Sequence, residues 1–295
     1  MKSKVYFIKD ITEENIVRIY EILEKELTGK VAVKVHSGEE GNQNFLHPEF
    51  MKKIIKRVDG TVTECNTAYE GTRNTTDKHK KLIEKHGWTK YFDVDIMDEE
   101  EPDKVLEIPN GKVIKQNYVG KHIDNYDSML VLSHFKGHPM GGYGGALKQL
   151  SIGVASSRGK AWIHSAGRTT DQTKLWDNLP EQDTFLEAMA DAASSVVDYF
   201  NKKQGIAFIN IMCNMSVDCD CCAVAEDPCM QDIGILASLD PVAIDKACID
   251  LVKNSNDKGK DHLLERINSR HGTHTIDAAY DLKIGNIDYE LIELD

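Results

Sequence analysis

The 295-residue chain carries 36 basic and 48 acidic residues, which gives a formal net charge of −12 at pH 7. An acidic chain lacks the basic surface on which nucleic-acid binding and binding to anionic membranes depend, so neither partner is expected. No segment approaches the roughly 18 consecutive apolar residues of a membrane helix, and the first residues contain no apolar signal segment. We therefore expect a cytoplasmic protein.

The first third of the chain alternates between short apolar runs and helical patterns. Strands are predicted at 5–8, 31–35 and 61–65, and helices at 12–29, 48–58 and 76–86. Strands that alternate with helices are typical of a parallel sheet with helices packed against it. The sequence therefore predicts an α/β fold with a mainly parallel sheet flanked by helices.

A hairpin and a buried strand follow. Residues 105–108 and 112–119 flank the turn sequence Pro109-Asn110-Gly111. The apolar run 128–135 predicts another strand, and a glycine-rich loop begins at its carboxyl end. In open α/β sheets, ligands bind outside the carboxyl ends of the strands. This position predicts a functional loop.

The second part of the chain begins after a polar segment. We interpret residues 166–183 as a linker between an N-terminal α/β domain, residues 1–165, and a smaller C-terminal α/β half, residues 184–295. In the C-terminal half, a helix is predicted at 185–200 and a strand at 205–212. Further elements are predicted from Pro241, capped by Asp240, near 260–270 and at 287–294.

The loop SHFKGHPMGGYGGALK, residues 133–148, combines cationic side chains with glycines. Glycines let the backbone approach an anion or a cofactor closely, although the loop matches neither a P-loop nor a dinucleotide fingerprint. A lysine desolvated near a helix start can become a nucleophile or a cofactor anchor. The alternative is a mobile polar loop without a ligand. The candidate residues here are His134, Lys136, His138, Gly141, Gly142, Gly144, Gly145 and Lys148, with His164 sixteen residues further on.

A cysteine cluster lies in NMSVDCDCCAVAEDPCMQD, residues 214–232. Thiolates and imidazoles favour Zn, Fe or Ni over Mg or Ca, so Cys219, Cys221 and Cys222 are candidate ligands. The spacing is not that of CxxC pairs, and half-buried thiols in a tight turn are the alternative interpretation. Two further loops, 35–48 and 65–79, follow predicted strands. Arg73 in the second loop is a candidate for binding a substrate carboxylate through its planar fork.

These stretches resemble a family of uncharacterised proteins with a domain of unknown function, often labelled Fe–S centre proteins. The resemblance lies in VAVKVHSGEEGN (31–42), NTAYEGTR (66–73), SHFKGHPMGGYGGALKQLSIGVASSRGKAWIH (133–164), VDCDC (217–221) and DIGILASLDPVAIDKACIDLV (232–252). Many relatives carry a ferredoxin-like insertion after the position of His164. Here that place holds SAGRTTDQTKLWDNLPEQD, without a cysteine. Intrinsic ferredoxin-type 4Fe–4S clusters are therefore not expected, and a separate ferredoxin is a conceivable partner.

The spacing of His138, Lys148 and His164 also resembles the nickel-pincer lactate racemases. In that family a lysine anchors the pincer cofactor, a histidine sixteen residues later ligates nickel, and a histidine ten residues before the lysine transfers protons. The resemblance implies these roles for Lys148, His164 and His138. The chain departs from the family pattern where Ala146-Leu147 precede the lysine and where Gly71-Thr72-Arg73 contains no second histidine. A racemase mechanism with two histidines is therefore not expected.

The combined prediction is a metal- or cofactor-dependent enzyme that transfers a proton or hydride on a small organic anion. The predicted catalytic residues are His138, Lys148 and Lys136; the predicted cofactor-binding residues are Lys148, Gly141, Gly142, Gly144, Gly145 and Arg73; the predicted metal ligands are His164, His134, Cys219, Cys221 and Cys222. The cofactor is expected to be Ni, Fe or Zn, as a bound ion or in a pincer-type group. The alternatives are a non-catalytic metal- or Fe–S-binding redox partner that uses the cysteines, and a scaffold whose loop positions a peptide. No feature of the sequence indicates an oligomeric state.

Overall fold

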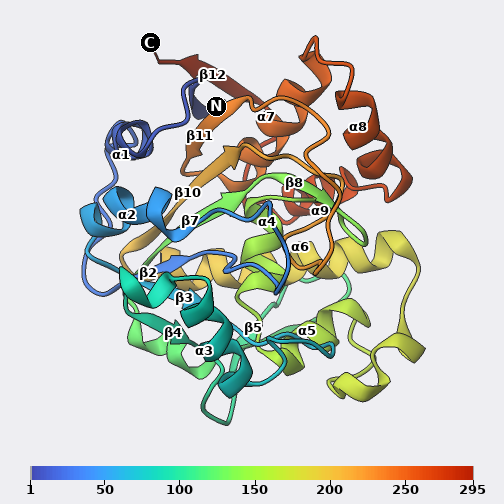
Figure 1. Ribbon diagram of the computed structural model, residues 1–295. Coiled ribbons are helices and arrows are strands. Elements are labelled where there is room, and N and C mark those ends of the chain that lie inside the picture. The colour runs from blue at the N-terminus through green and yellow to red at the C-terminus, as the bar shows by residue number, and fades with distance from the viewer. Residues whose placement is uncertain (1, 295) are drawn as a thin grey trace.

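A single eight-stranded sheet runs through the protein. The computed structural model describes residues 2–294, and the strand order is β12-β1-β11-β10-β7-β2-β3-β4 (Figure 1). The strands are β1 (Ser3–Ile8), β2 (Val31–Lys34), β3 (Gly60–Glu64), β4 (Val94–Ile96), β7 (Ser128–His134), β10 (Gly205–Met212), β11 (Gly234–Ser238) and β12 (Tyr289–Glu293). Only β11 runs antiparallel to its neighbours; the other pairs of this sheet are parallel. The predicted α/β fold with a mainly parallel sheet is confirmed.

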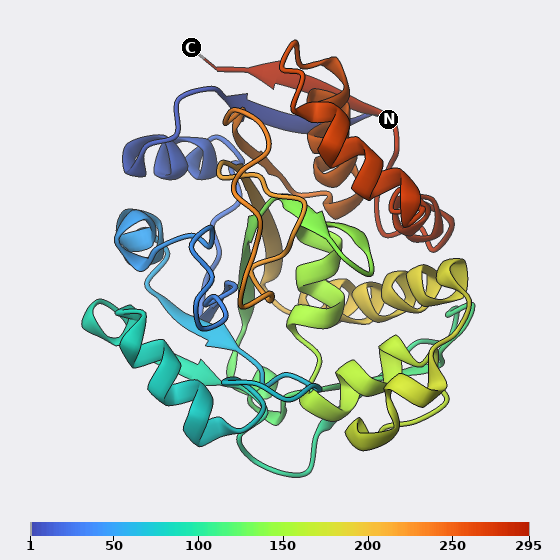
Figure 2. The ribbon, with the colours of Figure 1, turned by 45° about the vertical axis from the view of Figure 1, so that its right-hand side comes forward.

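Helices cover both faces of this sheet. They are α1 (Glu13–Glu21), α2 (Pro48–Arg57), α3 (Thr76–Lys85), α4 (Ala146–Lys148), α5 (Ser157–His164), α6 (Gln182–Asn201), α7 (Pro241–Asn254), α8 (Lys260–Ser269) and α9 (His274–Asp281). In Figure 2, α1 to α3 lie to the left of the sheet and α6 to α8 to its right. Two apolar cores follow from this arrangement, one on the α1–α2 face and one on the α6–α7 face. Among residues 2–294, no helix combines the length and the apolar character needed to span a bilayer.

The helix boundaries follow from local chemistry. Thr12 accepts a hydrogen bond from the backbone N–H of Asn15 at the start of α1, and Asp240 accepts two backbone N–H groups at the start of α7. The helix predicted to continue to residue 29 ends at Glu21 instead. Leu27 is nevertheless buried, and its N–H donates to the Tyr20 hydroxyl at 3.1 Å. The apolar spacing therefore extends beyond the helix because the following coil packs against the same core.

Two small hairpins complete the structure. The predicted pairing of residues 105–108 with 112–119 is confirmed as β5 (Lys104–Glu107) and β6 (Gln116–Val119), which pair antiparallel across a longer connection. The glycine-rich loop is itself a hairpin, formed by β8 (Lys136–His138) and β9 (Gly142–Gly144). The sequence did not predict this second hairpin, because glycine has a low strand propensity.

The predicted linker does not separate two sheets. Residues 166–183 contain the short 3₁₀ turns Gln172–Lys174 and Trp176–Asn178. Strand β10, which follows this segment, lies directly between β7 and β11 in the main sheet. Strands from both sides of the segment thus share one sheet. The division into residues 1–165 and 184–295 stays a prediction about independent folding.

Candidate functional site

A pocket of about 410 Å³ opens at the carboxyl ends of β2, β3 and β7. This is the edge at which α/β sheets bind ligands, and the volume is sufficient for a small organic molecule. Among the predicted site residues, Arg73, His138, Lys148, His164, Cys221 and Cys222 line it. The structure therefore brings together one residue from the loop after β3, three from the glycine loop and α5, and two from the cysteine cluster.

Lys148 ends the short helix α4, and a carboxylate from α7 fixes the start of that helix. Asp245 accepts the backbone N–H groups of Ala146 and Leu147 at 2.8 and 2.9 Å. Burial raises the pKa of Asp245 to about 6, against the opposing effect of these bonds. Position 145 must be glycine, because a Cβ there would lie 2.5 Å from the Asp245 Oδ1 atom. The two hydrogen bonds to Asp245 fix α4, which ends at Lys148, at the pocket wall.

Lys148 points its ammonium at the sulfur of Cys219. The Nζ–Sγ distance is 3.5 Å, and the backbone N–H of Cys221 also donates to Cys219 Sγ at 3.5 Å. Burial opposes ionisation of Cys219, but the interaction with Cys221 and the charge of Lys148 outweigh it and hold the Cys219 pKa well below its usual value. Burial likewise disfavours the Lys148 ammonium, yet Cys219 and Cys221 raise the Lys148 pKa. The two groups form a thiolate–ammonium pair.

Asp220 fixes the turn that carries Cys219 and Cys221. Its carboxylate lies 2.8 Å from His134 Nδ1 and 2.7 Å from Lys136 Nζ. Burial opposes the Asp220 charge, but His134 and Lys136 outweigh it and lower the Asp220 pKa. The other His134 nitrogen, Nε2, lies 2.6 Å from the Cys213 carbonyl oxygen. Both His134 nitrogens therefore face protein oxygens, so neither is directed at a metal ion.

Neither His134 nor Lys136 is among the residues that line the pocket. Both were predicted to act directly, His134 as a metal ligand and Lys136 as a catalytic residue. The structure places them beneath the cysteine turn, where their contacts with Asp220 position Cys219 and Cys221.

His138 has its hydrogen-bonding roles set by backbone donors. Its Nδ1 accepts the N–H groups of Met140 and Gly141 at 3.1 and 2.8 Å. The neutral ring therefore carries its proton on Nε2, which lies 3.7 Å from Cys221 Sγ. Burial, followed by the charge of Lys148, lowers the His138 pKa to about 4. In this geometry His138 is a neutral hydrogen-bond donor that faces a thiol.

His164 has the opposite arrangement. Its Nδ1 donates to the Lys160 carbonyl oxygen at 2.7 Å, so the neutral ring presents a lone pair on Nε2. Its ring also stacks on Phe185, with centroids 5.1 Å apart. Burial is the main reason that the His164 pKa falls to about 4. His164 is therefore the histidine of this pocket that is suited to accept a proton or to ligate a metal.

Arg73 has its guanidinium bound to protein groups. Its Nε donates to Glu39 at 3.0 Å and its Nη2 to the Tyr69 hydroxyl at 3.0 Å, while Nη1 lies 3.4 Å from His36 Nε2. Tyr69 in turn donates to the Cys221 carbonyl oxygen at 3.4 Å. Arg73, predicted to bind a substrate carboxylate, is thus held by a network that also supports the cysteine turn.

The four glycines predicted to bind a cofactor are not among the residues that line the pocket. Gly142 adopts a φ of +80°, and a Cβ there would lie 2.7 Å from the Cα atom of Gly272. A Cβ at Gly144 would meet the side chains of Lys136 and Lys148 at 3.4 and 3.5 Å. These glycines let the hairpin pack closely against its neighbours, which places His138 and Lys148 at the pocket.

Three of these side chains form a possible metal-binding group. Ligand atoms of His138, Cys219 and Cys221 lie within 4.8 Å of one another. The two sulfurs are soft donors of the kind that Zn, Ni and Fe prefer. His138 fits less well, because a metal-bound histidine normally donates from its second nitrogen, whereas the second nitrogen of His138 accepts two N–H groups. The fitting donors are therefore Cys219 and Cys221.

Several pocket residues were not predicted from the sequence. Lys34 and Glu64, at the ends of β2 and β3, form a buried ion pair at 2.6 Å. Lys160 and Gln149 also line the pocket. Lys160 lies one helical turn before His164 on α5, so a prediction of that helix would have identified it.

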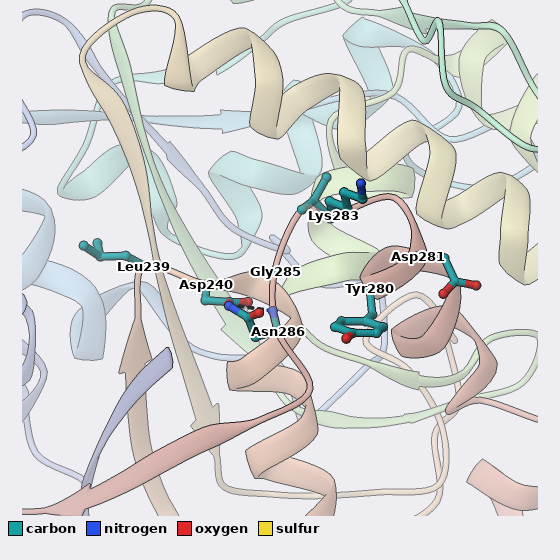
Figure 3. Close-up of a pocket in the computed structure, with 8 residues that line it drawn as sticks. Leu239, Asp240, Tyr280, Asp281, Lys283, Gly285 and Asn286 are labelled. Atoms are coloured by element: carbon teal, nitrogen blue, oxygen red, sulfur yellow. Dashed lines mark hydrogen bonds between the residues drawn. The ribbon is translucent and has the colours of Figure 1, made fainter. Parts of the chain in front are cut away.

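A larger pocket, of about 580 Å³, lies near the start of α7 and contains none of the predicted site residues. Figure 3 shows its walls, where Asp240 and Asn286 lie close together while Leu239, Asp281 and Lys283 project in different directions. Both Asp240 oxygens already accept hydrogen bonds from the protein. We therefore assign the candidate site to the smaller pocket.

Comparison with solved structures yields distant matches. A crystal structure from Thermotoga maritima, a structural-genomics target, aligns with a TM-score of 0.41 and 10% identity over 92% of this chain and 59% of the other. The lactate racemase apoprotein from Thermoanaerobacterium thermosaccharolyticum aligns with a TM-score of 0.40 and 17% identity over 70% of this chain and 50% of the other. The chain thus spans between half and three fifths of the length of these proteins. No curated protein matches the sequence.

A family model matches residues 31–250, well over half of the chain. Its description is "Domain of unknown function (DUF362)", with no mention of an iron–sulfur centre. The matched range includes the loops after β2 and β3, the glycine hairpin, α5 and the cysteine turn. The protein belongs to this family, DUF362.

Proposed function

We propose that this protein is an enzyme that binds a soft transition-metal ion at Cys219 and Cys221 and acts on a small organic anion in the adjoining pocket. The observation that carries the proposal is the convergence of the Cys219 and Cys221 sulfurs within 4.8 Å of each other, with Cys221 at the wall of the pocket and Lys148 beside Cys219. Zn, Ni and Fe are the ions that suit such ligands.

The roles of the other residues follow from their hydrogen bonds. A bound metal ion would supply Lewis-acid chemistry to an oxygen of the anion. His164 presents a neutral Nε2 lone pair as the proton acceptor, and His138 offers an N–H at the same pocket. Lys148 balances the Cys219 charge. Because the Lys148 ammonium contacts the Cys219 sulfur, we assign a bound ion to this site rather than a group attached to the lysine amine.

The metal site is tested by anaerobic titration of the protein with Co²⁺. Thiolate ligation produces an intense sulfur-to-cobalt charge-transfer absorption, which we expect in the wild-type protein. Cys219→Ser and Cys221→Ser should each weaken Co²⁺ binding by about 100-fold or more, because each removes one ligand. Cys248→Ser is the matched control, since Cys248 is a buried thiol of α7 outside the pocket.

Failure of the wild-type protein to develop this absorption would contradict the metal assignment. Equal loss in Cys248→Ser would show that the cysteine changes act through folding. The catalytic part is tested by incubating the metal-loaded protein with small carboxylic acids in D₂O and following deuterium incorporation by NMR. His164→Gln should abolish incorporation while the cobalt spectrum persists. Incorporation that is absent from the wild type, or unaffected by His164→Gln, would refute the proposed proton transfer.

A further inference from the structure

Lys160 places a buried ammonium in the pocket wall without a carboxylate beside it. Its side chain is 6% exposed, and its Nζ donates to the Ala155 carbonyl oxygen at 2.6 Å. Within residues 2–294, no Asp or Glu oxygen lies within 4.0 Å of this nitrogen. Asp98 influences it from further away, but the Asp98 oxygens accept the backbone N–H groups of Asn66 and Ser157. Burial is the main influence on Lys160 and lowers its pKa.

Gln149 adds an unused donor to the same pocket. It is 8% exposed, and its Nε2 group has no hydrogen-bond partner. Buried side-chain amides normally bond to a partner, so an orphaned one facing a pocket points to an acceptor on a ligand. A Cβ at Gly153 would lie 2.5 Å from Gln149 Oε1 and 3.3 Å from Lys34 Nζ. Glycine at 153 thus lets the Gln149 amide lie close to the Lys34 ammonium.

The cations that line the pocket differ in how close a carboxylate lies to them. Two of the other cations have a carboxylate partner at ion-pair distance: Lys34 with Glu64, and Arg73 with Glu39. Lys160 has none within ion-pair distance among the described residues. One ammonium and one amide N–H group match the two oxygens of a carboxylate. Apolar side chains also line the wall, among them Met140, Ile152, Leu175 and Trp176.

We infer that Lys160 and Gln149 form a subsite that binds the carboxylate of a monocarboxylic acid whose apolar body lies against Ile152 and Leu175. This inference deepens the proposed function, on which it rests for the reaction that follows binding. The ammonium and the amide donate to the carboxylate oxygens, so both buried donors gain acceptors. The role expected of Arg73 from the sequence passes to Lys160, because the Arg73 fork is already bound to protein groups.

The test measures binding of three probes by isothermal titration calorimetry: hexanoate, its neutral isostere hexanamide, and hexyl phosphate. The wild-type protein should bind hexanoate at least about tenfold more tightly than hexanamide, since a hydrogen bond to a charged group contributes about 1.5–3 kcal/mol. Lys160→Met should reduce hexanoate affinity to that of hexanamide. Gln149→Met should weaken it about three- to tenfold, and Lys53→Met, at an exposed lysine, should leave it unchanged.

Equal wild-type affinity for hexanoate and hexanamide would overturn the inference, as would a Lys160→Met protein that binds hexanoate like the wild type. Tighter binding of hexyl phosphate would overturn the monocarboxylate class. The cobalt spectrum of Lys160→Met checks that the fold is intact. Hexanoate binding that persists in Cys221→Ser, where cobalt binding is lost, would support the subsite independently of the metal site. A wild-type protein that shows the cobalt spectrum but binds hexanoate no more tightly than hexanamide would refute the subsite alone.

Discussion

Two buried lysines that line one pocket differ in how close a carboxylate lies to them. Lys34, at the end of β2, lies 2.6 Å from Glu64 and also donates to the Val35 carbonyl oxygen. Lys160, on α5, has a backbone carbonyl oxygen as its hydrogen-bond acceptor. Both are nearly inaccessible to solvent. The sequence alone does not distinguish these two lysines. The difference lies in the groups that surround them.

We expect Lys34 to stabilise the fold, whereas Lys160 gains an anionic partner when a ligand binds. Breaking a buried ion pair leaves an uncompensated charge. Substitution of Lys34 should therefore lower the free energy of unfolding strongly. A buried cation without a partner already destabilises the folded state, so its removal should cost little. Binding sites often retain such residues at the expense of stability.

The largest effect is expected from Lys34→Met. It leaves the Glu64 carboxylate buried without its cation, and the free energy of unfolding should fall by about 3–5 kcal/mol. Urea denaturation monitored by circular dichroism measures this change. A loss below about 1 kcal/mol would remove the contrast with Lys160.

The same variant should alter the pH dependence of stability. Burial opposes the Glu64 charge, but Lys34 outweighs it and holds the Glu64 pKa well below its usual value. A carboxylate with a lowered folded-state pKa stabilises the protein above the usual carboxyl range, and this contribution is lost as the pH falls through the folded-state pKa. In Lys34→Met, the decrease in the free energy of unfolding that protonation of Glu64 causes at acidic pH should therefore be absent.

An intermediate effect is expected from Ser37→Ala. The Ser37 hydroxyl donates to Glu64 Oε1 at 2.9 Å, and the Ser37 backbone N–H donates to the same atom at 2.8 Å. The substitution removes the hydroxyl bond to Glu64 and a 3.4 Å contact with His79 Nε2 but keeps the backbone bond, so the free energy of unfolding should fall by about 1.5 kcal/mol. Non-additivity with Lys34→Met in a double-mutant cycle would confirm that both act through Glu64. Strict additivity would contradict this.

The smallest effect, with the opposite sign, is expected from Lys160→Met. Methionine keeps much of the volume and removes the unbalanced charge, so the free energy of unfolding should stay unchanged or rise by up to about 1 kcal/mol. The same urea denaturation measures it. A decrease of more than about 2 kcal/mol would assign Lys160 a structural role, for example towards Asp98.

Much of the fold was accessible from the sequence because its strands and helices carry strong local signals. Pro48 and Asp240 mark helix starts that the structure confirms. Strand β11 was missed, because Gly234–Ser238 is short and follows the irregular cysteine segment. Its antiparallel insertion between β1 and β10 depends on long-range pairing that no local pattern encodes.

The sequence identified only part of the candidate site. Spacing identified His138, Lys148 and His164, which line the pocket. It did not distinguish them from His134 and Lys136, whose hydrogen bonds to Asp220 direct them away from the pocket. Lys160 and Gln149 were missed, because a lysine or glutamine becomes notable only when burial leaves it without a partner.

The position of β1 constrains how the chain reaches this structure during synthesis. Its neighbours in the sheet are β11 and β12, both formed after residue 233. Strand β1 therefore has no paired neighbour in this sheet until these two later strands have been synthesised. Until then β1 and the adjoining edge of β10 expose unpaired amides, which are templates for aggregation. Nascent chains of this protein should consequently depend on chaperones most strongly just before Gly234–Ser238 emerges.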